Sequence, residues 1–213
     1  VKEKVDEKAT PNLRAIQFNI FENLGTLPID NFTTFLKNIS SEDKNIISKL
    51  GIRVGAKYFF VPNFLKKTSM ELSAILWFVF DDSKFDGFLP LPKDGRVSFL
   101  SDSKMKKNYW LAIGYLKLKN FALRIDVFER IFFIARQKIK KGPFLDSADL
   151  MNPVGCNKDQ LRDILEFCGF KTFKLLNDRH LYFFETKRTK IEKNNMKSKK
   201  IKLTKKPKKK KII

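Results

Sequence analysis

Four basic residues lie around an aromatic run and could contact nucleic acid. Arg53 and Lys57 come before the aromatic run 58–60, and Lys66 and Lys67 come after it. A single strand binds through its phosphates to basic groups while its bases stack on aromatic rings. This mixture of side chains therefore predicts non-covalent binding of single-stranded nucleic acid. The alternative is that the rings belong to the core and the basic groups are only solvated.

A second basic segment closes the sequence. Residues 187–213 hold 14 basic residues and one acid, a net charge of +13, which leaves +8 of the total +21 for residues 1–186. The segment has few apolar residues, so we expect it to be disordered. Its terminal lysines are predicted to bind phosphates without reading sequence. They are Lys205, Lys206, Lys208, Lys209, Lys210 and Lys211.

No pattern for an independent active site is found. The sequence has neither GxxxxGK[ST] nor GxGxxG, so no loop is expected to hold nucleotide phosphates. His180 is the only histidine and is interpreted as a surface or packing residue. Two cysteines are too few for a structural zinc site. The sequence predicts no catalytic residue, cofactor or metal in this chain.

The composition favours a polyanionic partner, either nucleic acid or an anionic membrane surface. No stretch reaches the roughly 18 apolar residues of a membrane-spanning helix, and the longest apolar run is 74–80. A strongly basic balance is typical of proteins that bind nucleic acid. The sequence begins with Val1 rather than Met, which we interpret as a piece of something longer.

The first half is predicted to be a linker, 1–10, followed by a mainly helical accessory subdomain, 11–107. Pro11 can open a helix because proline fits the first helical turn. Asp30 and Ser41 are predicted to cap two further helices. An extended segment at 52–61, an apolar helix at 69–80 and a long loop at 81–107 complete this half.

The second half contains two patterns typical of a helix start. Asp126 with Glu129, and Asn157 with Gln160, have the spacing of a capping box. They predict helices at 127–140 and from 158. A strand at 110–118 precedes them, a short helix at 147–151 lies between them, and a hairpin turning at 177–178 follows them.

This order is typical of a winged helix-turn-helix. We therefore predict an α+β, mostly helical fold, with a helical N-terminal half, a winged-helix-like module at 108–186 and a disordered basic tail at 187–213. The helix predicted to begin at 158 carries three acids against Lys158 and Arg162. A helix that reads bases must approach phosphates, so this net negative charge argues against sequence-specific readout.

Several short runs, in this order and spacing, together resemble the C-terminal region of one helicase family. The resemblance covers about residues 45–174, with Lys67 where a proline is usual and Asn120 where a glycine is expected. The runs are GIRVG at 51–55, FVPNFLK at 60–66, LSAILW at 72–77, Gly114-Tyr115, ALRID at 122–126, Glu129-Arg130, Leu150-Met151, Gly155-Cys156 and LEFCGF at 165–170. The family is that of the mitochondrial degradosome DExH RNA helicases and their alphaproteobacterial relatives.

The resemblance implies a C-terminal accessory, nucleic-acid-binding region of an ATP-dependent helicase. ATP and magnesium would be bound by motor domains of the same polypeptide, outside this chain. The expected partners are RNA or DNA and those motor domains, with no membrane, in the bacterial cytoplasm. Two alternatives stay open: a stand-alone basic RNA-binding or ribosome-associated protein, and a scaffold that docks other proteins.

Overall fold

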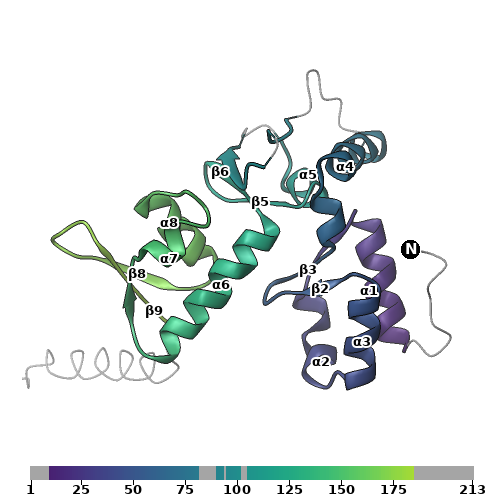
Figure 1. Cartoon of the computed structure of the whole chain (residues 1–213), viewed down its shortest axis with the longest axis horizontal. Helices are drawn as coiled ribbons and strands as arrows, with labels where there is room; N and C mark the ends of the chain where they lie inside the picture. The colour runs from purple at the N-terminus through teal and green to yellow at the C-terminus, as the bar shows by residue number, and fades with distance from the viewer. Residues whose placement is uncertain (1–9, 82–89, 94, 102–104, 185–213) are drawn as a thin grey trace, which may run out of the picture.

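A computed structural model describes residues 10–81, 90–93, 95–101 and 105–184, and it confirms the α+β class. About half of these residues are helical, and the strands form three small antiparallel sheets, ordered β1-β3-β2, β4-β6-β5 and β7-β9-β8. Figure 1 shows the N-terminal helices on one side, the C-terminal module on the other, and α6 running between them. Residues 1–9 of the predicted linker and the whole of the predicted tail at 187–213 lie outside the described residues.

The N-terminal part packs helices against the first sheet. Its elements are α1 (Pro11–Glu22), β1 (Thr26–Pro28), η2 (Asp30–Phe32), α2 (Thr33–Lys37), α3 (Ser41–Lys49), β2 (Arg53–Val54) and β3 (Tyr58–Phe60). Pro11 opens α1 as predicted. Leu13, Ile16 and Ile20 follow the helical period, so they share one face and are buried with Ile47 and Phe59.

Two predicted caps are wrong by small shifts. Helix α3 is capped by Ser40, whose hydroxyl oxygen accepts from the Asp43 amide at 3.0 Å, and not by Ser41. Asp30 lies inside the 3-10 turn that precedes α2 and makes no side-chain cap there. In both cases the sequence indicates a polar residue near the start of a helix. It does not define the residue at which the backbone becomes helical.

The segment predicted as extended at 52–61 is a tight hairpin. Arg53 pairs with Phe60 and Val54 with Phe59, and the Gly55 amide donates to the Tyr58 carbonyl at 2.8 Å. In one continuous extended segment Val54 and Tyr58 would share a side, but in the hairpin Val54 lies opposite Phe59 and therefore on the other side from Tyr58. Alternate residues of a strand point to opposite faces. Tyr58 and Phe60 of β3 therefore pack in one hydrophobic cluster and Phe59 in another.

The middle of the chain carries the second sheet. Its elements are η3 (Pro62–Leu65), α4 (Lys67–Phe80), β4 (Ser98–Leu100), α5 (Lys107–Ala112), β5 (Tyr115–Lys117) and β6 (Phe121–Arg124). The strand predicted at 110–118 is instead helix α5 followed by β5. Tyr109, Trp110 and Ile113 are buried together against α4, and Gly114 reverses the chain with φ +77°. Strand β4 lies in the region predicted as loop, where it pairs with β6.

The C-terminal module contains α6 (Ile125–Lys140), β7 (Phe144–Leu145), α7 (Ala148–Met151), α8 (Lys158–Phe167), β8 (Lys171–Lys174) and β9 (His180–Phe183). The predicted hairpin is confirmed, and Asp178 takes the left-handed φ of 57° in its turn. Cys168 and His180 are both buried. The His180 amide donates to the Asp146 carboxylate at 2.6 Å. The predicted domain boundaries stay predictions.

The capping box at the start of α8 is confirmed and gives a first testable expectation. The Asn157 side chain accepts from the Gln160 amide at 2.8 Å, and the Gln160 side chain accepts from the Asn157 amide at 3.1 Å. We expect Asn157→Ala to lower the free energy of unfolding by about 1 kcal/mol in urea titrations. Glu166→Ala, a substitution of an exposed acid near the end of the same helix, is the comparison, and an equal loss there would contradict the assigned cap.

Candidate nucleic-acid interface

The turn of the β2–β3 hairpin encloses the carboxylate of Glu129 from α6. The Ala56 amide donates to Oε2, and the amides of Lys57 and Tyr58 donate to Oε1 at 2.9 and 2.8 Å. Gly55 leaves the space that this carboxylate fills, because an added Cβ would overlap the Glu129 carboxyl carbon. Glu129 therefore fixes the hairpin on α6.

The predicted capping box of α6 is wrong. Helix α6 begins at Ile125 with Arg124 as N-cap, so Glu129 lies too far into the helix to reach the N-cap amide. Asp126 instead accepts from the Arg124 guanidinium at 2.7 and 3.0 Å and from the Val127 amide at 2.9 Å. Asp126 and Glu129 both accept hydrogen bonds from backbone amides. Only Asp126 accepts one from its own helix, whereas Glu129 accepts from the β2–β3 hairpin.

Burial and hydrogen bonding shift the pKa of the Glu129 carboxyl in opposite directions. Burial raises the pKa of the Glu129 carboxyl above its ordinary value, because a charged group is less stable away from water. The three backbone amides and the positive charge of Lys57 lower the pKa in opposition. The carboxylate is thus occupied by the hairpin and offers no acceptor to an external ligand.

A basic stripe continues along α6 from Glu129. Phe133, Arg136 and Lys140 follow it by four, seven and eleven residues, a spacing that places them on one side of a helix. All three are exposed, and the Phe133 ring is 61% exposed. The stripe combines two cations with one aromatic ring that is open to solvent.

Lys57 joins this stripe from the hairpin. Its ammonium lies 6.0 Å from the centre of the Phe132 ring, and the Arg136 guanidinium lies 5.8 Å from the centre of the same ring. Arg53 lies opposite Phe60 in the register, so it points to the same side of the hairpin as the core that α6 shares. We call Arg53, Lys57, Phe133, Arg136 and Lys140 the hairpin–helix face.

Lys57 interacts electrostatically with the nearby Glu129 carboxylate, but the cations of this face form no ion pairs with described acids. No ion pair joins Arg53, Lys57, Arg136 or Lys140 to an acid within the part of the chain that the structure describes. The nearby Asp126 is paired with Arg124. Such a concentration of unpaired cations attracts polyanions.

The structure separates the four basic residues predicted from the sequence into two pairs on different elements. Arg53 and Lys57 lie in the hairpin next to α6, whereas Lys66 and Lys67 lie where α4 begins, after η3. The six tail lysines fall outside the described residues. Phe133, Arg136 and Lys140 were not singled out from the sequence. Their spacing from Glu129 indicates that they share one side of α6. It points to a binding face only once the structure shows that the basic hairpin lies beside Glu129.

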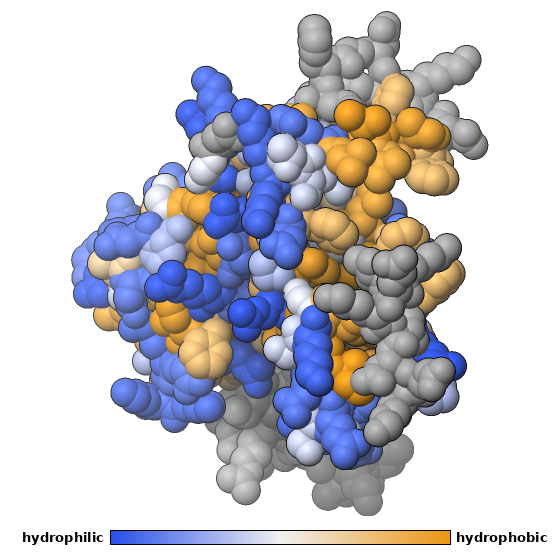
Figure 2. All heavy atoms as spheres, turned by 45° about the vertical axis from the view of Figure 1, so that its right-hand side comes forward, coloured by the Kyte–Doolittle hydropathy of each residue, from blue (hydrophilic) through white to orange (hydrophobic). Residues whose placement is uncertain are grey.

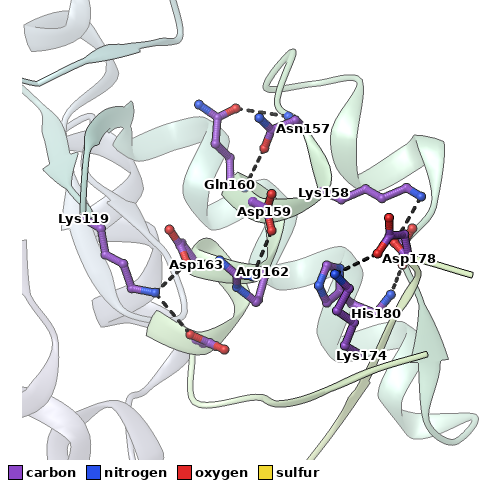
Figure 3. A network of polar contacts seen from close by, with 12 residues as sticks. Lys119, Asn157, Lys158, Asp159, Gln160, Arg162, Asp163, Lys174, Asp178 and His180 are labelled. Carbon is purple, nitrogen blue, oxygen red and sulfur yellow. Dashed lines mark hydrogen bonds and ion pairs between the residues drawn. The ribbon is translucent and has the colours of Figure 1, made fainter. Parts of the chain in front are cut away.

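The acids of α8 are bound by basic neighbours, as Figure 3 shows. Lys119, from the turn between β5 and β6, contacts Asp163 at 2.7 Å and Glu166 at 3.5 Å. Arg162 contacts Asp159 at 2.9 Å. The hydrogen bond to Asp163 raises the pKa of Lys119. Helix α8 therefore presents paired charges, in contrast to the open cations of α6.

The described residues form neither a metal-binding cluster nor a membrane-spanning helix. Within the described ranges, no cluster of three or more His, Cys, Asp or Glu side chains is arranged to hold a metal ion. None of the helices described is both long and apolar enough to cross a membrane. No family model, curated protein or solved structure matches the chain.

Proposed function

We propose that this chain binds nucleic acid without reading its sequence, through the hairpin–helix face and the basic tail. The observation that carries the proposal is the arrangement of this face: Lys57 of the hairpin and Arg136 of α6 lie 6.0 and 5.8 Å from the same Phe132 ring, and the exposed Phe133 and Lys140 share one side of α6 with Arg136. Phosphates would take the cations and a base would stack on Phe133. This combination favours single strands, whose bases are free to stack.

We further propose that the chain is the C-terminal accessory region of an ATP-dependent DExH-type helicase. ATP and magnesium would then belong to motor domains of the same polypeptide. The support is the sequence resemblance and the position of its runs. GIRVG and Glu129 meet in the hairpin contact, and Leu65 of FVPNFLK packs where a Cβ on Gly114 would stand. An upstream reading frame with GxGKT and DExH motifs tests this origin directly.

A winged-helix assignment for the C-terminal module belongs to the same proposal. The order α6-β7-α7-α8-β8-β9, with β9 between β7 and β8, supports it. In that arrangement α8 would be the helix that reads the major groove. Its paired acids disfavour such a role, so we assign binding to α6 instead, without base-specific contacts.

The decisive experiment is charge reversal on the hairpin–helix face. In a chain lacking residues 187–213, we expect the triple variant Lys57→Glu, Arg136→Glu, Lys140→Glu to lose at least tenfold in affinity for a labelled single strand. That loss corresponds to about 1.4 kcal/mol. Fluorescence anisotropy measures the binding, and circular dichroism checks that the fold is kept.

A matched control reverses the same number of charges elsewhere. Lys158, Lys171 and Lys174 are exposed on α8 and β8. Changing these three to Glu is expected to lower affinity less than threefold. Equal losses in the two triple variants would show that only net charge matters and would remove the proposed face. Phe133→Ala supplies an independent arm, expected to weaken single-strand binding more than duplex binding because only unpaired bases can stack.

A further inference from the structure

A cavity lies between the end of α1, strand β1 and helices α4 and α5. Its volume is about 300 Å³, within the range of sites for small ligands. Figure 1 shows α4 and α5 above α1, so parts of the chain that are distant in sequence meet around the cavity. Its lining includes the apolar side chains of Leu24, Trp77 and Leu111 and the polar ones of Glu22, Asn23 and Asn108. We call it the Trp77 cavity.

An indole ring and a leucine in an unusual conformation form two walls of the Trp77 cavity. Trp77 of α4 is half-buried, and its ring meets that of Tyr109 edge-on, with the ring centres 5.2 Å apart. Leu24 has φ +53°, in the left-handed region where glycine or asparagine is usual at the end of a helix. Strained residues of this kind are concentrated at functional sites.

The polar groups of the cavity include a carboxylate without a basic partner. Glu22 is exposed and forms no ion pair with any other described residue, although the whole chain has a net charge of +21. The Asn23 side-chain amide donates to the Asn19 carbonyl at 2.8 Å, which leaves its oxygen as an acceptor. Asn108 is exposed in the first turn of α5. The cavity therefore favours a ligand that offers N–H donors, and its carboxylate repels phosphate.

The Trp77 cavity adjoins the hairpin–helix face through β1. Pro28, which lines the cavity, lies opposite Tyr58 in the register, and the Ile29 amide donates to the Lys57 carbonyl at 2.9 Å. Residues directly opposite each other lie on the same face of a sheet. Pro28 is therefore on the face where Tyr58 meets Phe128 of α6. A strand whose phosphates contact Lys57 can place a neighbouring base in the cavity.

We propose that the Trp77 cavity binds a guanine base of the single strand held by the hairpin–helix face. Unpaired bases are recognised by stacking on aromatic rings and by hydrogen bonds to their edges. Guanine presents two adjacent donors, N1–H and N2–H, which match the two oxygens of the Glu22 carboxylate. In adenine and cytosine the amino group lies beside a ring nitrogen that accepts, and a carboxylate repels such an acceptor. Asn108 would donate to O6 of guanine.

This inference rests on the proposed function and adds a base preference at one position of the strand. The contacts of the hairpin–helix face itself remain independent of sequence, because they are made to phosphates. The cavity would thus set which part of a bound strand lies beside Lys57.

Nucleosides test the cavity on the full chain, because they carry no phosphate to attract the basic tail or the hairpin–helix face. The chain has two tryptophans, and Trp110 is fully buried. In heteronuclear NMR spectra the indole signal of Trp77 therefore reports on the cavity, with Trp110 as internal reference and Trp77→Phe as the assignment. We expect guanosine to shift the Trp77 signal with a Kd at least tenfold lower than those of adenosine and cytidine. Inosine, which lacks the N2 amino group, should lie between them.

A conservative variant at an exposed position tests the role of the carboxylate. Glu22→Gln should reduce the preference for guanosine over adenosine to less than threefold. Glu42→Gln, at an exposed acid of α3, is the matched control and should keep the preference. Val79→Ala is a second control, because Val79 is 70% exposed on α4 and does not line the cavity. Figure 2 shows the exposed hydrophobic side chains of α4 at the upper right.

Two single strands that differ in one base connect the cavity to the proposed function. One is a run of uridines with a central guanosine, and the other has adenosine at that position, so the tail attracts both equally. We expect the strand with guanosine to bind the full chain at least threefold more tightly in fluorescence anisotropy. Glu22→Gln should remove this difference, and so should the reversal of Lys57, Arg136 and Lys140.

Three outcomes would overturn the inference. Equal shifts from all nucleosides, or none, would leave the cavity without a preference for guanine. A lower Kd for arginine amide than for guanosine would assign the cavity to a cationic ligand. Two strands that bind equally would separate the cavity from the bound strand. If the proposed function itself fails, neither strand binds, so the two failures are distinguishable.

Discussion

Glu129→Ala is expected to destabilise the fold by about 3–5 kcal/mol, the largest loss from any single substitution proposed for this chain. The carboxylate accepts from the amides of Ala56, Lys57 and Tyr58, and alanine would leave all three without an acceptor. A hydrogen bond to a charged group contributes about 1.5–3 kcal/mol. The turn can shift and admit water, so the effect should be smaller than three such contributions added together.

Urea unfolding followed by circular dichroism measures this effect. Glu129→Gln keeps one acceptor but places an NH2 group against the amides, so an intermediate loss is expected. Gly55→Ala tests the contact from the other side, because its methyl group would displace the carboxylate. Glu166→Ala, at an exposed site, is the control and should change stability by less than about 0.5 kcal/mol. An unfolding curve for Glu129→Ala that matches this control would show that the hairpin is held by other contacts.

The contact between Glu129 and the hairpin should also affect nucleic-acid binding. Lys57 reaches the Phe132 ring from a hairpin that Glu129 holds on α6. If the hairpin detaches, Lys57 no longer lies beside Arg136. Glu129→Gln, where it stays folded, should therefore weaken single-strand binding although it removes a negative charge. A merely electrostatic effect would have the opposite sign.

Features set by local sequence could be predicted. Pro11 at the start of α1, the capping box of Asn157 and Gln160, and the turn at Asp178 are all determined by residues within a few positions of one another. Side-chain caps and turn residues act on their own backbone. These three elements lie where the local pattern predicts them, whereas the caps predicted at Asp30, Ser41 and Asp126 do not.

The error at α5 has a different origin. Tyr109 and Trp110 have high strand propensity, and the sequence alone favours a strand there. In the structure the Trp77 ring of α4 meets the Tyr109 ring at 5.2 Å, and Phe99 of β4 meets Trp110 at 5.4 Å. Packing from elements distant in sequence thus decides the local conformation. Propensity is a weak guide when a segment is buried on one side.

Glu129 shows why part of the candidate site could not be predicted from the sequence. Its spacing from Asp126 matches a capping box, and the local pattern gave no reason to look further. Its partners are 71 to 73 residues away in sequence. Arg53 and Lys57 were identified from composition alone, but their relation to Arg136 depends on that long-range contact. Charge could be predicted from the sequence, whereas its arrangement into one face could not.

Removal of residues 187–213 is expected to cause the largest loss of nucleic-acid affinity, at least 100-fold at low salt. The segment carries +13 of the net charge of +21, and Lys205, Lys206 and Lys208–Lys211 are its densest part. Each phosphate contact adds about −0.7 to the slope of log K against log salt for a single strand. If roughly six tail cations contact phosphates, deletion should reduce the slope by about 4. The remaining slope would then belong to the body.

Two full-length variants separate charge from chain length in this effect. Replacing the lysines of the tail by glutamine keeps the length and should reproduce the deletion, whereas replacing them by arginine should retain both affinity and slope. Combining the glutamine tail with the reversal of Lys57, Arg136 and Lys140 should then bring the slope close to zero, because both groups of phosphate contacts are lost. An unchanged slope after deletion would show that the body makes the contacts and that the tail serves another purpose. A steep slope that survives the combined variant would place the contacts on basic groups outside both proposed regions.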